Sequence, residues 1–493
     1  MKTFTFNLIP MKRIIVLCLF MANLVAAQQP IKPYGAIPSK RQLAWHDTEV
    51  YGLIHFTPTT FENKEWGFGD ADPQTFNPTA FNADQIIKAA KAGGLKGIIL
   101  VAKHHDGFAL WPTKTTNYNI SKSPFRNGKG DMVREIAQAA RKNGLKFGVY
   151  CSPWDRNNPK YGTAEYLAIY QAQLKELYSN YGQLFMSWHD GANGGDGYYG
   201  GAREKRSIDN TTYYDWNNTW AITRKMQPMA NIFSDIGWDV RWVGNENGYA
   251  NETSWATFTP MPPKGKNVAV PGQANYPESP EGIRNGKFWM PAECDVPLRQ
   301  GWFYHAKEQP KTPTVLFDLY LKSVGRGAGL DLGLAPDTRG QLHEDDVAAL
   351  QSFGNMVKHT FATNLAKGAQ LKASNTRGKT YTVANLLDGN KQSYWATTDQ
   401  VHQASIAIDL KTPKTFDIVS LQEYIPLGQR IEGYTIEILE NNIWKKVYEG
   451  TSIGAKRLIR LEHAVTTNKV RLNITKSPVC ITLSEFGLYR FTP

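Results

Sequence analysis

Two carboxylates stand where predicted buried strands give way to loops. Asp190 follows the apolar run of residues 184–186, and Glu246 ends the stretch 239–246. An α/β barrel places its chemistry at such strand ends. An Asp that attacks an anomeric carbon and a Glu that protonates the leaving oxygen would suit retaining glycoside hydrolysis. Glu252 and Glu293 are alternatives to Glu246 as the acid, and any one of these carboxylates could instead be a helix cap or an ion pair.

A pair of histidines, His104 and His105, stands beside Asp106 at another predicted strand end. Neighbouring side chains in an extended segment point to opposite sides, so we do not expect one metal ion to take both. No HExxH spacing supports zinc either. The sequence therefore predicts no metal centre here, and the histidines are expected to hydrogen-bond sugar hydroxyls or, alternatively, to be buried against backbone groups.

Aromatic side chains and one arginine accompany these polar clusters. Stacking on the apolar face of a sugar and ordinary core packing are both open for the rings. Arg241 is predicted to anchor a hydroxyl or to tune Glu246, with a surface ion pair as the alternative. The tryptophans concerned are Trp66, Trp154, Trp188, Trp242 and Trp302.

Strand and helix patterns alternate over the first two thirds of the chain. Continuous apolar runs with polar carboxyl ends indicate buried parallel strands, and amphipathic stretches between them indicate helices. This order predicts a (β/α)8-like TIM barrel over residues 28–362. The predicted strands are 51–56, 97–102, 145–150, 184–190, 231–235, 239–246 and 288–293, and the helices are 83–90, 131–142, 164–181, 314–325 and 345–361.

From residue 365 to residue 493 the period changes to two, as in 405–410, 434–439 and 469–474. Such alternation with turns between the runs predicts an antiparallel β-sandwich. Residues 385–390, followed by Tyr394 and Trp395, could form a binding edge, a structural cation site or a plain turn.

Composition limits the function classes. The formal net charge is +12, but Lys and Arg are scattered, so nucleic-acid binding is not expected. Residues 1–27 resemble a signal peptide whose apolar run is too short for a membrane span. The sequence therefore predicts an exported protein, periplasmic or extracellular, with no transmembrane segment. No pair of cysteines indicates a disulfide framework or a zinc knuckle.

Taken in order, these motifs resemble glycoside hydrolase family 29, the α-L-fucosidases. The resemblance rests on His55, Glu65-Trp66, residues 103–108, residues 110–112, Tyr150 with residues 152–155, and residues 188–191. It implies a barrel that needs no cofactor, Asp190 as nucleophile, and a fucosylated glycan as partner. The residues expected to contact the substrate are His55, Glu65, Trp66, His104, His105, Tyr150, Trp154, Trp188, Arg241 and Trp302.

Two further runs, 241–246 and 301–305, resemble the branch that prefers α-1,3/1,4-linked fucose, and imply Glu246 as the acid/base. Met186-Ser187, His189 and Gly333 depart from the family pattern. The first two departures keep a fucose-like sugar such as α-L-galactose as an alternative substrate, and a non-catalytic glycan-binding protein is a third hypothesis. The tail is similar to discoidin-like carbohydrate-binding modules, in which a structural cation could be bound.

Overall fold

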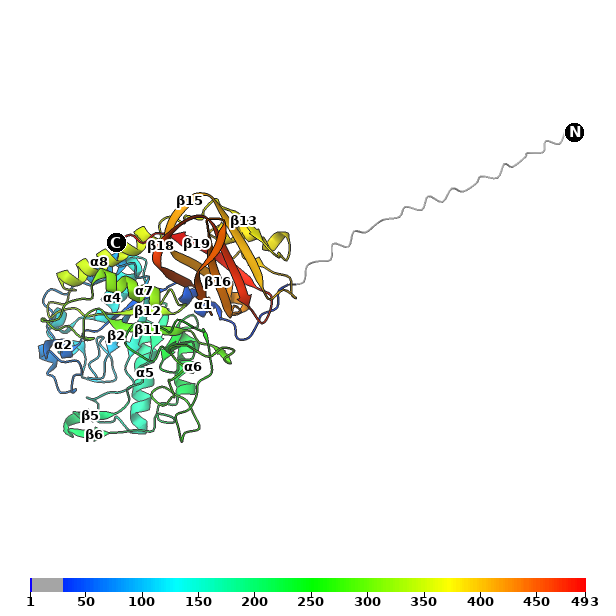
Figure 1. Ribbon diagram of the computed structural model, residues 1–493. Coiled ribbons are helices and arrows are strands. Elements are labelled where there is room, and N and C mark those ends of the chain that lie inside the picture. Colours follow the sequence, from blue (N-terminus) through cyan, green and yellow to red (C-terminus); the bar gives the residue numbers. More distant parts are fainter. Residues whose placement is uncertain (2–29) are drawn as a thin grey trace. The chain divides into compact units, whose positions relative to one another are not determined.

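The computed structural model describes residue 1 and residues 30–493 (Figure 1). The signal peptide predicted at residues 1–27 lies outside the described residues, apart from Met1. Residues Pro33–Pro493 form one compact unit, which holds the fold and the site. Over the described part of the chain, no helix has both the length and the apolar character needed to cross a bilayer.

Eight parallel strands close into a barrel in the order β1-β12-β11-β8-β7-β4-β3-β2. This confirms the predicted TIM-like barrel. The strands β1 and β2 are apolar along most of their length because both of their faces are buried, one inside the barrel and one beneath the helices, whereas β11 carries Glu293 and Asp295 and β12 carries Asp331. Their bounds are β1 Val50–Ile54, β2 Gly97–Lys103, β3 Lys146–Cys151, β4 Met186–Trp188, β7 Asn231–Ser234, β8 Val240–Trp242, β11 Ala292–Pro297 and β12 Gly329–Leu334.

Helices connect most of the barrel strands. The helix α3 begins after Asn82, whose side chain accepts the Gln85 N–H, and α4 begins after Asp131, which caps Arg134 in the same way. Only residues 235–239 separate β7 from β8. The helices are α1 Lys40–His46, α2 Pro58–Phe61, α3 Ala83–Ala92, α4 Met132–Lys142, α5 Ala164–Asn180, α6 Trp216–Met226, α7 Pro313–Lys322 and α8 Glu344–Thr360.

The prediction of one barrel strand at residues 288–293 has the wrong bounds. Residues Phe288–Trp289 form β10, which pairs outside the barrel with β9 Thr257–Phe258. The barrel strand β11 starts at Ala292, after Pro291, whose missing N–H interrupts strand pairing. Glu293 is therefore the second residue of its strand and lies inside the barrel rather than at the carboxyl edge.

The C-terminal region is an antiparallel sandwich, as predicted. The long strand β15 pairs with β18 along most of its length, with β13 beside its first half and β19 beside its second half, and the register of the β15–β18 pair shifts after Asp409 and again after Phe416. Their inward residues, such as Ile406 and Leu472, share one core. The strands are β13 Gln370–Ala373, β14 Trp395–Ala396, β15 Ala404–Glu423, β16 Gly433–Glu440, β17 Ile443–Gly450, β18 Arg457–Lys476 and β19 Thr482–Tyr489, while the small hairpin of β5 Gly195–Gly197 and β6 Glu204–Arg206 belongs to the barrel loops.

The barrel and the sandwich are joined by specific polar contacts. The Leu458 N–H donates to the Gly325 carbonyl, and the Ser254 N–H donates to Ser452 Oγ. Lys456, just before β18, forms an ion pair with Glu49, just before β1. The two regions thus meet through backbone groups as well as charges.

Candidate active site

A cavity of about 650 Å³ opens at the carboxyl ends of the barrel strands. Its volume lies in the range of small-molecule sites. Ten of the twelve predicted site residues line it, namely His55, Glu65, Trp66, His104, His105, Tyr150, Trp188, Asp190, Glu246 and Trp302. Trp154 and Arg241 do not.

Asp190 follows β4 and is held by three neighbours. Tyr150 donates its hydroxyl to Asp190 Oδ2 at 2.9 Å, and the backbone N–H of Ala192 donates to Oδ1 at 2.7 Å. Nε2 of His105 lies 3.8 Å from Oδ2. The side chain is about 25% exposed, so the carboxylate is oriented and still reaches the cavity.

The three histidines of the cavity are neutral near pH 7. Burial lowers the pKa of His55 to about 3 and the pKa of His104 well below its ordinary value. Burial also lowers the pKa of His105, although the charge of Asp190 opposes this. His104 Nδ1 has no hydrogen-bond partner among the described residues. A neutral ring both donates and accepts, which suits a sugar hydroxyl.

Glu246 stands at the cavity mouth in the loop after β8. The indole N–H of Trp302 points at its Oε2 from 3.4 Å. Loss of hydration raises the pKa of this carboxyl above its ordinary value, and the charges of Asp190 and Glu65 raise it further, while Trp302 opposes them. A carboxyl that keeps its proton longer than usual is suited to act as an acid.

Glu65 holds the loop that carries Trp302. Its carboxylate accepts the N–H groups of Trp302 at 2.8 Å and Phe303 at 3.2 Å, and His305 Nε2 lies 2.6 Å from Oε1. His55 packs against Trp302 with ring centroids 5.2 Å apart. One exposed carboxylate thus ties the loop after β1 to the loop after β11.

Glu293 and Glu252, the alternatives to Glu246 as the acid, are bound to other side chains. Glu293 is fully buried and accepts hydrogen bonds from Tyr51 Oη and Trp188 Nε1. It fixes the Trp188 ring, which stacks between Tyr150 and Phe233 beneath the cavity. Glu252 is exposed and accepts the hydroxyl of Tyr448 from the sandwich. Neither lines the cavity, so of the three only Glu246 can face Asp190 across it.

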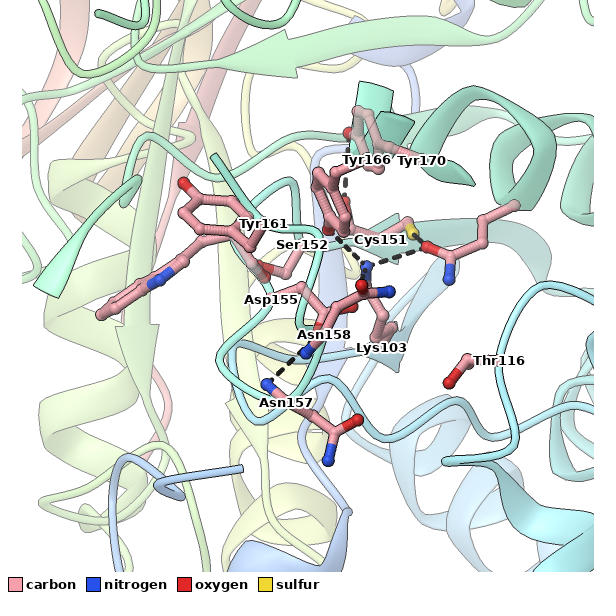
Figure 2. A network of polar contacts seen from close by, with 12 residues as sticks. Lys103, Thr116, Cys151, Ser152, Asp155, Asn157, Asn158, Tyr161, Tyr166 and Tyr170 are labelled. Atoms are coloured by element: carbon pink, nitrogen blue, oxygen red, sulfur yellow. Dashed lines mark hydrogen bonds and ion pairs between the residues drawn. The ribbon is translucent and has the colours of Figure 1, made fainter. Parts of the chain in front are cut away.

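A buried polar network lies behind the histidines (Figure 2). Lys103 is fully buried, and its Nζ contacts Asp155 at 3.3 Å, Tyr166 at 3.0 Å and Gln173 at 2.8 Å. Asp155 in turn accepts the N–H groups of Asn157 and Asn158. Since Lys103 directly precedes the two histidines, this paired charge fixes the end of β2 against the loop after β3.

Trp154 belongs to the support of the site. Its ring packs 5.5 Å from Trp66 and 5.3 Å from His105, and its Nε1 donates to Tyr199. Trp154 therefore packs behind two side chains that do line the cavity, and the substrate contact expected of it stays a prediction.

Arg241 lies away from Glu246. Its guanidinium is fully buried and donates to the backbone carbonyls of Ser279, Met290 and Trp255. It therefore organises the long segment between β8 and β11, in place of the predicted hydroxyl contact or surface pair.

Sequence reasoning missed three polar residues that line the cavity: Asp295, Asn247 and Gln300. Asp295 accepts Trp242 Nε1 at 2.8 Å, and burial with the nearby charges of Glu293 and Glu246 raises its pKa well above the ordinary value. Asp295 lies near the carboxyl end of β11, where a functional carboxylate is expected. It was missed because the strand was predicted at residues 288–293, which end before Asp295.

His189, one of the departures from the family pattern, does not reach the cavity. It is fully buried, with Nδ1 2.8 Å from Tyr170 Oη and Nε2 3.0 Å from Ser187 Oγ. The side chain of His189 therefore has its hydrogen-bond partners behind β4 and does not line the cavity.

Within residue 1 and residues 30–493, no three or more His, Cys, Asp and Glu side chains lie together in an arrangement that could hold a metal ion. In the sandwich, burial and the charge of Asp388 raise the pKa of Glu485 to about 7, although the charge of Lys391 lowers it. The structural cation that the sequence suggested for this domain stays a prediction.

Carboxylates, neutral histidines and tryptophan rings thus surround one cavity at the catalytic edge of a TIM-like barrel. These features define the class of protein, a barrel glycoside hydrolase.

Comparisons with known proteins specify the family. Residues 36–360 match the model of the α-L-fucosidase family, and residues 370–486 match the F5/8 type C domain. The chain is 38% identical to α-L-fucosidase 1 of Arabidopsis thaliana over 93% of this chain and 88% of that protein. It belongs to the α-L-fucosidase family, glycoside hydrolase family 29.

Solved structures agree with this assignment. The chain is similar to the structure of SpGH29, with a TM-score of 0.85 and 35% identity over 94% of this chain and all of the other. It is also similar to a Ruminococcus gnavus family 29 fucosidase in complex with fucose, with a TM-score of 0.83 and 32% identity over 94% and 97% of the two chains. The non-catalytic hypothesis is therefore set aside.

Proposed function

We propose that this enzyme is an exported, periplasmic or extracellular, retaining exo-α-L-fucosidase that removes terminal α-1,3/1,4-linked fucose from glycans. The observation that carries the proposal is that Asp190 and Glu246 line the same cavity at the carboxyl edge of the barrel. The proposal also accounts for the neutral histidines, which can bind hydroxyl groups without adding charge.

In the first step, Asp190 attacks the anomeric carbon of fucose, and the bond from that carbon to the leaving oxygen breaks. Glu246 gives its proton to the leaving oxygen. In the second step, Glu246 takes a proton from water, whose oxygen attacks the same carbon and releases Asp190. Tyr150 orients Asp190, and Trp302 keeps Glu246 directed into the cavity.

The linkage preference rests on the far side of the cavity. Asn247, Gln300 and Trp302 line the part contributed by the loops after β8 and β11, beyond the histidine cluster. Amides and an indole can bind the hydroxyls of a neighbouring sugar, so a branched oligosaccharide fits this wall better than an aryl aglycone does. The α-L-galactose alternative is not favoured, because none of the departures that suggested it, Met186-Ser187 and His189, lines the cavity.

The test combines three variants with the wild type on α-1,3/1,4-fucosylated oligosaccharides. Asp190→Ala is expected to abolish turnover without unfolding the protein. Glu246→Ala is expected to regain activity on an aryl fucoside when azide is added, whereas the matched variant Glu293→Ala is not. NMR should show α-fucose as the first product. Release of β-fucose, or azide rescue at Glu293 instead, would refute the assigned mechanism.

A further inference from the structure

A second carboxylate, Asp235, lies beside the proposed nucleophile, and the steps above do not use it. Asp235 directly follows β7, the neighbour of β4 in the barrel. The register pairs Trp188 with Phe233, so Asp190 and Asp235 each stand two positions beyond that pair. Parallel neighbouring strands therefore bring the two carboxylates to the same edge.

The turn after the nucleophile rests on Asp235. A Cβ atom added to Gly191 would collide with the Asp235 carboxylate, so only glycine permits this approach. No atom larger than hydrogen fits between the turn and the carboxylate at this point. A substitution of Asp235 is therefore expected to change the packing of the turn that carries Asp190.

Asp235 also anchors a loop from the other side. Tyr276 donates its hydroxyl to Asp235 Oδ2 at 2.9 Å. In the same loop, Gly272 has φ +72°, and a Cβ there would overlap the Gly191 carbonyl and the Asn193 side chain. The loop of residues 270–279 thus packs directly on the nucleophile turn.

This loop reaches the acid side of the cavity as well. The ring of Tyr276 meets Trp242 edge-on, with centroids 5.7 Å apart, and Trp242 donates to Asp295 at 2.8 Å. One continuous set of contacts therefore runs from Asp235 around the cavity wall to the loop that carries Glu246.

The surroundings of Asp235 disfavour its ionised form. Burial and, after it, the negative charge of Asp190 raise the pKa of Asp235 from 3.8 to about 6, although the hydrogen bonds from the Tyr276 hydroxyl and the Gly272 N–H lower it. The groups that face Asp190 are Tyr150 and the neutral His105. Above about pH 6, an ionised Asp235 therefore lies against the turn that carries Asp190.

We propose that Asp235 is a positioning residue for Asp190, which repels the ionised nucleophile and thereby favours its conversion to an uncharged ester. The inference rests on the proposed function. When the bond from Asp190 to the anomeric carbon forms and the leaving oxygen departs with the proton of Glu246, the negative charge on Asp190 disappears. The repulsion from Asp235 then disappears with it, so an ionised Asp235 lowers the barrier of this step.

The test separates the charge of Asp235 from its hydrogen bond. Asp235→Asn keeps an oxygen that accepts from Tyr276 but has no charge, whereas Tyr276→Phe keeps the charge and removes the bond. The measurement is kcat and KM for fucoside hydrolysis by all three enzymes between about pH 4.5 and about pH 8.

In the wild type, kcat/KM is expected to fall as the pH drops through about 6, where Asp235 takes up its proton. Asp235→Asn should lose this inflection and, at about pH 7.5, show kcat lower by about tenfold with KM little changed. Tyr276→Phe should keep an inflection but move it to higher pH, because the hydrogen bond that it removes lowers the pKa of Asp235. Asp235→Ser, which is smaller and also uncharged, should lose the inflection too and serves as a second variant if the Asn form does not fold.

The proposal is overturned if folded Asp235→Asn or Asp235→Ser keeps the wild-type inflection and rate. That result would leave the proposed function intact. A wild type that does not hydrolyse fucosides, or an active Asp190→Ala, would instead overturn the proposed function, so the two failures are distinguishable.

Discussion

At the scale of single residues, the site works by orienting one carboxylate. Asp190 is a short side chain on a loop, and its two oxygens are fixed by different neighbours, Tyr150 on one and the Ala192 N–H on the other. Such preorganised hydrogen bonds reduce the reorganisation that an attack would otherwise require.

Replacing Tyr150 by Phe is expected to lower kcat/KM by roughly 10- to 100-fold, because a hydrogen bond to a charged group contributes about 1.5–3 kcal/mol. The ring stays in place between His104 and Trp188, so the melting temperature should change little. Steady-state kinetics and thermal unfolding measure the two effects.

The matched control is Tyr178→Phe. This buried hydroxyl bonds Ser187 and Thr223, away from the cavity, so its loss should leave kcat/KM close to the wild-type value. Equal losses in both variants would mean that the Tyr150 effect is structural.

At the scale of elements, loops from distant strands hold one another. The loop of residues 301–305 has little secondary structure of its own and is positioned by Glu65, from the loop after β1. His305 completes the contact by bonding both Glu65 and Asn63. Trp302 is therefore placed against Glu246 and His55 by residues far away in sequence.

His305→Ala should loosen this loop and raise KM by about fivefold, the equivalent of one lost hydrogen bond of about 1 kcal/mol, with a smaller change in kcat. Amide hydrogen exchange over residues 301–305 should become faster. The control is Lys307→Ala, an exposed side chain two residues further on, which should change neither quantity. An unchanged KM in His305→Ala would contradict this role.

At the scale of the whole molecule, a charge contact links the barrel and the sandwich. Glu49 is mostly buried and pairs with Lys456 of the sandwich and with Lys96. Burial raises the pKa of Glu49, but the two lysines outweigh it and lower the pKa from 4.5 to about 2. Because the folded pKa lies below the unfolded one, the pairing stabilises the fold above about pH 4.5 and this contribution is lost as the pH falls toward 2.

Glu49→Gln should therefore lower the free energy of unfolding by roughly 1–3 kcal/mol near pH 7, and the difference from the wild type should shrink as the solution is acidified. Chemical unfolding at several pH values measures it. Glu62→Gln, which breaks the exposed pair with Lys64, should cost less than about 1 kcal/mol at every pH. A pH-independent difference for Glu49→Gln would show that packing, and not charge, is lost.

Much of this molecule is determined locally by its sequence. The apolar runs of β1, β2 and β3, the amphipathic stretches of α3 and α4, and the alternation in β15 and β18 each predict their element, because hydrophobic periodicity acts within a few residues. Asp190 is identified for the same reason, since a strand ends and a carboxylate follows.

Tertiary structure decided what depends on contacts across the barrel. Pro291 moved the start of β11, so Glu293 became a buried support of Trp188 while Asp295 reached the cavity. Arg241 and His189 form buried hydrogen bonds, for example to Ser279 and Tyr170, that no local sequence pattern predicts. Asp235 became a neighbour of Asp190 only through the register of β4 and β7. Which side chains share a cavity follows from strand register and barrel closure, and these arise from pairings between residues far apart in the chain.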